Sequence, residues 1–273
     1  MRLRLAPPVR AIALLVGLAL VAMSAGCAPT SRSVGAAPAK SGPATSVTAP
    51  TGPATETATS PATAGTTAAA PTTSTAGRAG GLPPGGPVAL TFDDGPDPTW
   101  TPQILAVLKE NHIKATFFEI GKEVRANPRI ARMVLAAGMV IGDHTESHLD
   151  LRKASAAVVT AQIKDGAADI QRITGEHVTY FRFPYGAITP RVRTIATGLG
   201  LKVVSWDLDT EDWKKPEANW IVRHVIDLVH PGEIILMHDG GGDRSRTVAA
   251  LKAIIARLKA HSYRFVTLDQ LQK

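Results

Sequence analysis

The 273-residue chain has a single cysteine, Cys27, so no disulfide can form within it. It has no apolar run of the about 20 residues that a membrane-spanning helix needs, because the run from Ala11 to Met23 is too short. It also lacks the His-Glu-x-x-His pattern of one class of metallopeptidases and the glycine-rich loop with Lys and Ser or Thr that cradles phosphate. These absences argue against a disulfide scaffold, a membrane span, such a peptidase and a P-loop phosphatase.

The positive charge of the chain is small where the chain can fold. The net charge is +7, but six of the 30 Lys and Arg residues and one of the 23 Asp and Glu residues precede Pro87. The remainder carries 24 basic and 22 acidic residues, a net charge of +2. Its basic residues are not clustered with stacking aromatics, so the sequence indicates no nucleic-acid binding and suits an uncharged or mildly anionic polymer.

The first 26 residues have the pattern of an export signal. Three arginines precede the apolar run, which ends in Ser24-Ala25-Gly26-Cys27. This end resembles a bacterial lipoprotein signal, in which the cysteine is lipidated after cleavage, although Ser24 stands where Leu is usual. The alternative is an ordinary signal peptide cut near Ala25, with Cys27 as a free thiol. Both alternatives place the mature protein outside the cytoplasm, as a membrane-anchored lipoprotein or in secreted form.

Residues 27–86 consist almost entirely of Ala, Thr, Pro, Ser and Gly. Such a segment has too little apolar side-chain area to offset the entropy of ordering it, so we expect a disordered tether. If Cys27 carries a lipid, the tether lets a globular domain sample a shell of cell wall above the membrane. The alternative is a linker with no function beyond separating the segments on either side of it.

Residues 87–273 are long enough for one domain with its own core. Short apolar or β-branched runs alternate with longer amphipathic stretches, which predicts seven strand–helix units and a parallel sheet. The predicted strands are Val88–Phe92, Ala115–Ile120, Met139–Gly142, Thr179–Phe181, Lys202–Trp206, Glu233–Met237 and Arg264–Val266. The predicted helices are Pro102–Asn111, Pro128–Ala137, Ala156–Ile173, Pro190–Leu199, Asn219–Val229 and Thr247–Lys259, followed by a short terminal turn or helix.

This alternation fits both an open doubly wound sheet and a barrel. The chemically active residues all follow predicted strands, and they are Asp93, Asp94, His144, Arg182, Asp209, Asp212 and His238. For five strands spread through a sheet to converge on one point, curling the sheet into a ring is the economical solution. We therefore predict an α/β fold that is a distorted, incompletely closed (β/α) barrel with about seven parallel strands.

Two motifs of this set have complementary chemistry. His144 and His148 have a spacing that can place two imidazoles around one metal ion, although this pair alone is a weak signal. Asp93 and Asp94 precede Gly95-Pro96, which in isolation would often be only a polar turn. Together, one Asp completes a two-His, one-Asp ligand set with open positions, and the other Asp can act on a water molecule bound there.

The motifs, in this order, resemble those of the polysaccharide deacetylases, the family 4 carbohydrate esterases with a NodB-homology domain. The matching segments are Thr91-Phe92-Asp93-Asp94-Gly95-Pro96, His144-Thr145-Glu146-Ser147-His148, Arg182-Phe183-Pro184-Tyr185, Asp209-Thr210-Glu211-Asp212-Trp213 and Leu236-Met237-His238. The resemblance covers residues 87–273 and implies a deformed (β/α) barrel. It also implies that Asp93 is the catalytic base and that Asp94, His144 and His148 bind the metal.

The resemblance assigns roles to the later segments as well. Arg182 is expected to hold Asp93 ionised and oriented, with a structural ion pair as the plainer interpretation. The backbone N–H of Tyr185 is expected to face the oxyanion. His238 is expected to be the general acid, with its pKa raised by Asp212.

The resemblance further implies a substrate pocket. Trp213 and Leu236 are expected to form the walls of a small pocket for the acetyl methyl group, and plain core positions are the alternative. The other five histidines match no motif and are expected at the surface or in packing, namely His112, His177, His224, His230 and His261.

The expected reaction is removal of N-acetyl groups from a polymer of N-acetylglucosamine, with release of acetate. Peptidoglycan is the expected substrate, chitooligosaccharide and acetylated xylan are the alternatives, and a non-catalytic glycan-binding module is the alternative from another class. The expected cofactor is one divalent ion, Zn²⁺ first and Co²⁺ second. Besides the glycan we expect no partner and a monomer, with membrane contact only through a lipid on Cys27.

Overall fold

The structure, a computed structural model, describes residues 84–271. The predicted signal peptide, Cys27 and all but the last residues of the predicted tether lie outside this range. Within it, no helix has both the length and the apolar character needed to cross a membrane.

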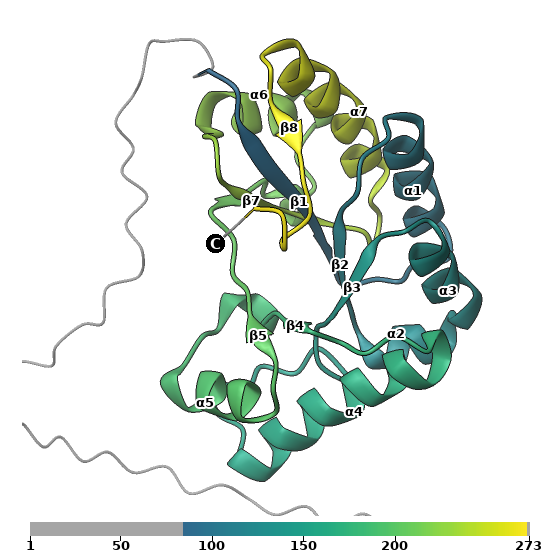
Figure 1. Ribbon diagram of the computed structural model, residues 1–273, viewed down its shortest axis with the longest axis vertical. Coiled ribbons are helices and arrows are strands. Elements are labelled where there is room, and N and C mark those ends of the chain that lie inside the picture. The colour runs from purple at the N-terminus through teal and green to yellow at the C-terminus, as the bar shows by residue number, and fades with distance from the viewer. Residues whose placement is uncertain (1–83, 272–273) are drawn as a thin grey trace, which may run out of the picture. The chain divides into compact units, whose positions relative to one another are not determined.

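One parallel sheet forms the centre of the domain (Figure 1). Its strands are β1 (Pro87–Asp93), β2 (Thr116–Glu119), β3 (Val140–Asp143), β4 (Tyr180–Phe181), β5 (Lys202–Val203), β6 (Leu208–Asp209), β7 (Ile234–His238) and β8 (Arg264–Phe265). Seven of them lie in the order β5-β4-β3-β2-β1-β7-β6, and β8 pairs with the first two residues of β1. Every pairing is parallel.

The sheet is curled but not closed. Strands β5 and β6 are the two ends of the row, and no pairing joins them among the described residues. The predicted incompletely closed barrel is confirmed. The prediction missed β6 and made β5 too long, because two-residue strands at the ends of a sheet leave no hydrophobic pattern.

Helices cover the outer face of the sheet in an arc that Figure 1 shows from α6 through α7, α1 and α3 to α4 and α5. They are α1 (Trp100–Glu110), α2 (Gly121–Ala126), α3 (Pro128–Ala136), α4 (Ala156–Thr174), α5 (Pro190–Gly198), α6 (Ala218–Leu228) and α7 (Ser245–Ala260). Two 3-10 turns, η1 (Pro184–Gly186) and η2 (Asp212–Lys214), overlap predicted functional segments. Helix α2 was not predicted, because its six residues are too few for a helical period.

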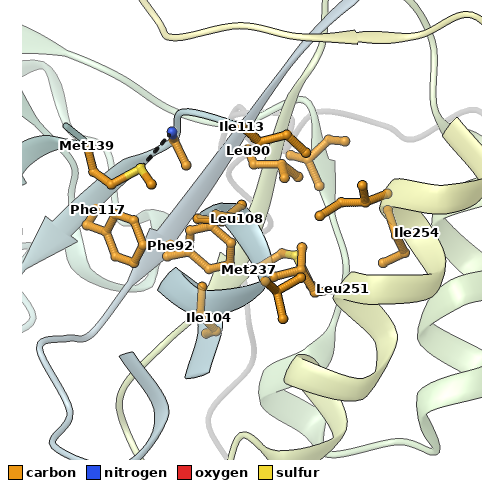
Figure 2. Close-up of a cluster of buried hydrophobic side chains, with 14 of the residues drawn as sticks. Leu90, Phe92, Ile104, Leu108, Ile113, Phe117, Met139, Met237, Leu251 and Ile254 are labelled. Carbon is orange, nitrogen blue, oxygen red and sulfur yellow. Dashed lines mark hydrogen bonds between the residues drawn. The ribbon is translucent and has the colours of Figure 1, made fainter. Parts of the chain in front are cut away.

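The main core lies between the sheet and these helices. In Figure 2, Phe92 of β1 stacks on Phe117 of β2 with ring centroids 4.9 Å apart, and Leu108 of α1 and Leu251 of α7 belong to the same fully buried cluster. Truncating a buried phenylalanine of this kind to alanine costs about 3–5 kcal/mol of stability. The core therefore fixes β1 and β7, which carry functional residues at their ends.

Alternation along the strands sends these functional residues to the other face. In β1, Leu90 and Phe92 face the helices, whereas Ala89 belongs to a separate inner cluster with Leu268 and Leu271 of the C-terminal turn. Side chains of a strand alternate between faces, so Asp93 points to the inner face with Ala89. The same alternation in β7 places His238 on that face.

Candidate active site

The two histidines of the predicted ligand set are presented by a tight turn after β3. The Asp143 carboxylate accepts a hydrogen bond from the Thr145 backbone N–H at 2.9 Å, and Thr145 Oγ1 accepts one from the His148 N–H at 3.0 Å. Thr145 and His148 both adopt positive φ, 71° and 59°. As a result, the rings of His144 and His148 lie 5.0 Å apart, on the same side of the turn.

Helix α4 packs closely against this turn. A Cβ atom at Gly166 would stand 2.3 Å from Asp143 Oδ1 and 2.9 Å from the Thr145 carbonyl oxygen. Only glycine lets the helix come so near.

The third predicted ligand, Asp94, lies opposite the histidines at the end of β1. Its Oδ1 atom is 3.6 Å from His144 Nε2 and 3.3 Å from His148 Nε2. This oxygen is buried and has no hydrogen-bond partner within residues 84–271. His144 Nδ1 lies 2.9 Å from the Arg182 carbonyl oxygen. Because that oxygen can only accept, Nδ1 carries the proton and Nε2 keeps its lone pair for a ligand.

The electrostatics of the three residues suit a divalent metal ion. Burial lowers the pKa of His144 to about 3 and also lowers the pKa of His148, so both imidazoles are neutral at neutral pH. One ligand atom from each residue lies within 4.8 Å of the others. Two neutral imidazoles, a carboxylate and an unpartnered buried oxygen therefore form a site that can hold a metal and leave coordination positions open.

Asp93, the predicted base, is held by Arg182. Asp93 Oδ1 accepts a hydrogen bond from Arg182 Nη1 at 2.7 Å, and the same nitrogen donates to Thr91 Oγ1 at 2.8 Å. The guanidinium is fully buried and lies 4.1 Å from the centre of the Phe118 ring. Burial raises the pKa of Asp93, while the charge of Arg182 opposes this rise. Arg182 thus fixes the direction of the carboxylate and favours its charged form.

His238, the predicted acid, is paired with Asp212. His238 Nδ1 lies 2.7 Å from Asp212 Oδ1, and Asp212 Oδ2 accepts hydrogen bonds from the His238 backbone N–H at 3.0 Å and from Thr247 Oγ1 at 2.8 Å. Burial alone would lower the pKa of His238, but the hydrogen bond and charge of Asp212, with smaller contributions from Asp94 and Asp93, raise it to about 9. His238 is therefore protonated at neutral pH and can donate a proton.

These groups border one cleft of about 400 Å³. Leu236 is buried and lines it, whereas Trp213 is 48% exposed at its edge and so is not a core residue. Tyr185 is 66% exposed, has a positive φ of 59°, and lies with its ring 4.5 Å from that of His148. Eight of the ten predicted site residues line this cleft, and the other two, Arg182 and Asp212, bond the lining residues Asp93 and His238. The five other histidines do not line the cleft.

The sequence interpretation assigned no catalytic, metal-binding or substrate-binding task to several residues of this cleft. These are Phe183, Gly186, Trp206, Asp209, Gly241 and Arg244. Nor did it anticipate three fully buried acids, Glu119, Asp143 and Asp239. Positions next to recognised motifs, such as Asp143 before His144, are the one signal that could have found some of them.

Comparison with known proteins identifies the family of the chain. A sequence model of the polysaccharide deacetylases matches residues 81–204. A peptidoglycan-N-acetylglucosamine deacetylase of Bacillus cereus is 44% identical over 186 residues, which cover 67% of this chain and 87% of that protein. The chain belongs to the polysaccharide deacetylase family.

Other members of the family differ in the substrate that their names give. A chitooligosaccharide deacetylase of Azorhizobium caulinodans is 35% identical over 188 residues, which cover 64% of this chain and 90% of that protein. Among solved structures, a peptidoglycan N-acetylglucosamine deacetylase in complex with an N-oxidanyl-benzamide compound superposes with a TM-score of 0.66. It is 39% identical, and the match covers 70% of this chain and 90% of that one.

Proposed function

We propose that the protein is a metal-dependent hydrolase that removes N-acetyl groups from N-acetylglucosamine-containing polysaccharide, with peptidoglycan as substrate. One observation carries the proposal: the metal-binding set, the Asp93–Arg182 pair and the His238–Asp212 pair open into the same cleft. A base, an ion site and an acid in one place are the parts that amide hydrolysis needs.

The predicted catalytic and metal-binding residues each have a proposed task. A metal ion bound by Asp94, His144 and His148 would polarise the acetyl carbonyl and lower the pKa of a water molecule. Asp93, oriented by Arg182, accepts a proton from the attacking water. The backbone N–H of Tyr185 donates to the oxyanion that develops on the carbonyl. His238, kept protonated by Asp212, then donates a proton to the departing nitrogen.

The proposed ion is Zn²⁺, with Co²⁺ as the second candidate. Imidazole and carboxylate ligands in a site with open positions are typical of catalytic zinc. The pocket bordered by Trp213 and Leu236 is proposed to take the acetyl methyl group, because Leu236 offers an apolar wall next to His238.

Peptidoglycan is favoured by the 44% identity to a relative named for that activity. Chitooligosaccharide is the second candidate, named for a 35% identical relative, and acetylated xylan is the third. We also propose that the protein acts outside the cytoplasm as a monomer. Residues 1–26 would be a lipoprotein signal, Cys27 the lipidated residue and residues 27–86 the tether of a catalytic domain at 87–273.

Acetate release from three glycans tests the proposal. The full chain, loaded with Zn²⁺, is incubated separately with peptidoglycan, chitin oligomers and acetylated xylan, and the acetate released is measured. We expect release from peptidoglycan above the other two. Zero release from all three, with peptidoglycan retained by the protein in a sedimentation assay, would instead identify a glycan-binding module.

A further inference from the structure

The chain segment after β7 packs closely against the metal ligand Asp94. We call Gly240 and Gly241 the glycine turn. A Cβ atom at Gly240 would stand 2.0 Å from the Asp94 carbonyl oxygen, and one at Gly241 would stand 2.7 Å from Asp94 Oδ2. Asp94 therefore faces the histidines through Oδ1 and the glycine turn through Oδ2.

A glycine backbone is too permissive to hold such a contact alone, and Arg244 supplies the restraint. Arg244 Nε donates to the Gly240 carbonyl oxygen at 2.6 Å, and Nη2 donates to the Gly241 carbonyl oxygen at 3.3 Å. The side chain is only 3% exposed and borders the cleft. The rigid fork of a guanidinium suits two neighbouring acceptors, which a lysine amine cannot match.

We propose that Arg244 is a positioning residue for the metal ligand Asp94 and acts through the glycine turn. With the turn fixed, the Asp94 carboxylate cannot rotate away from His144 and His148. This inference rests on the metal site of the proposed function, but it concerns a residue outside the metal ligands, the base and the acid. Partners that orient metal ligands typically contribute about 10–100-fold to metal affinity.

The first test is Zn²⁺ affinity of the full chain, measured by competition with a chromophoric chelator at fixed pH. We expect Arg244→Ala to bind Zn²⁺ about 10–100-fold more weakly than the wild type. Arg244→Lys should fall between the two, because it keeps the charge and loses the fork. The matched control is Arg246→Ala, which removes an exposed arginine that bonds the Lys215 carbonyl oxygen and Glu217 and should leave the affinity unchanged.

A glycine pair tests the same contact without replacing Arg244, whose Nη2 atom lies 3.1 Å from the position that a Cβ atom at Gly241 would take. Gly241 and Gly242 both have positive φ, 73° and 125°, so alanine strains the backbone at either position. A methyl group at 241 would collide with Asp94, whereas one at 242 would meet only the flexible end of Lys215 at 3.3 Å. We expect Gly241→Ala to weaken Zn²⁺ binding and Gly242→Ala to leave it unchanged. The visible absorption of Co²⁺-loaded chains should change with Gly241→Ala, because it reports coordination geometry.

The outcomes separate this inference from the proposed function. Weak binding by Arg244→Ala and Gly241→Ala, with normal binding by both controls, supports the positioning role. Wild-type affinity in Gly241→Ala overturns it even if Arg244→Ala fails to fold, and the proposed function then stands. A wild-type chain that binds no Zn²⁺ overturns the metal site and the positioning role together.

Discussion

Replacing Asp212 with asparagine should move the pH dependence of turnover. Asparagine keeps an oxygen that can accept from His238 Nδ1, now 2.7 Å from Asp212, but it removes the negative charge. The charges of Asp93 and Asp94 also favour protonated His238, yet a bound divalent cation would offset them. Of these three contributions to the pKa of His238, the one from Asp212 therefore persists when the metal is bound.

The size of the effect follows from the pKa of His238. With Asp212 this pKa is about 9, and without its charge we expect a value at or below the ordinary 6.5. The difference of about 2.5 pH units corresponds to about 3 kcal/mol. At pH 8 the protonated fraction of His238 would fall from about nine-tenths to about 3%, so turnover should drop about 30-fold.

The assay is acetate release measured from pH 5 to pH 10 at saturating substrate and Zn²⁺. We expect the alkaline limb of the kcat profile to shift to lower pH in Asp212→Asn. Asp165→Asn, which removes an exposed carboxylate from α4, should keep the wild-type limb. If Asp212→Asn retains the alkaline limb of the wild type, the assignment of His238 as the acid tuned by Asp212 is wrong.

Three further changes test the remaining assignments. Asp93→Asn should lower turnover by about 10²–10⁴-fold with normal Zn²⁺ content, and undiminished turnover at full occupancy would contradict its role as base. His148→Ala, or exhaustive chelation of the wild type, should abolish acetate release, and added Zn²⁺ should restore activity only to the chelated wild type. Burial and the charge of Asp239 raise the pKa of Glu119 well above 4.5. Because the folded chain then holds this proton more tightly than the unfolded chain, stability should fall as the pH rises above 4.5. Glu119→Gln should remove this loss, seen as a higher unfolding midpoint at pH 8 and little change near pH 4; an unchanged pH dependence would exclude Glu119 as its source.

The sequence was informative where local pattern and topology agree. Apolar runs followed by Asp93, His144 and His238 predicted strands with polar residues at their carboxyl ends, and parallel strands bring those ends to one edge. The structure places these residues around one cleft for that reason. The curled, open sheet followed from the same argument.

The parts that were missed depend on contacts distant in sequence. Nothing local to Arg244 signals that it is buried, since an arginine at the start of a helix is usually exposed. Glu119 ends a strand that reads as ordinary, yet its carboxylate is buried without a hydrogen-bond partner among the described residues. Only the packed chain shows that the glycine turn rests on Asp94.

The metal ligands and the acid pair of the cleft come from two separate stretches of the polypeptide. Asp94, His144 and His148 all precede residue 150, whereas Asp212 and His238 follow residue 210. The residues that bind the cation and those that deliver the proton are thus distant in the sequence, and they meet because β1 and β7 lie side by side. A descendant that replaces only His238 or Asp212 can lose turnover and still hold both an ion and a sugar chain, which gives a catalyst a short evolutionary route to becoming a lectin.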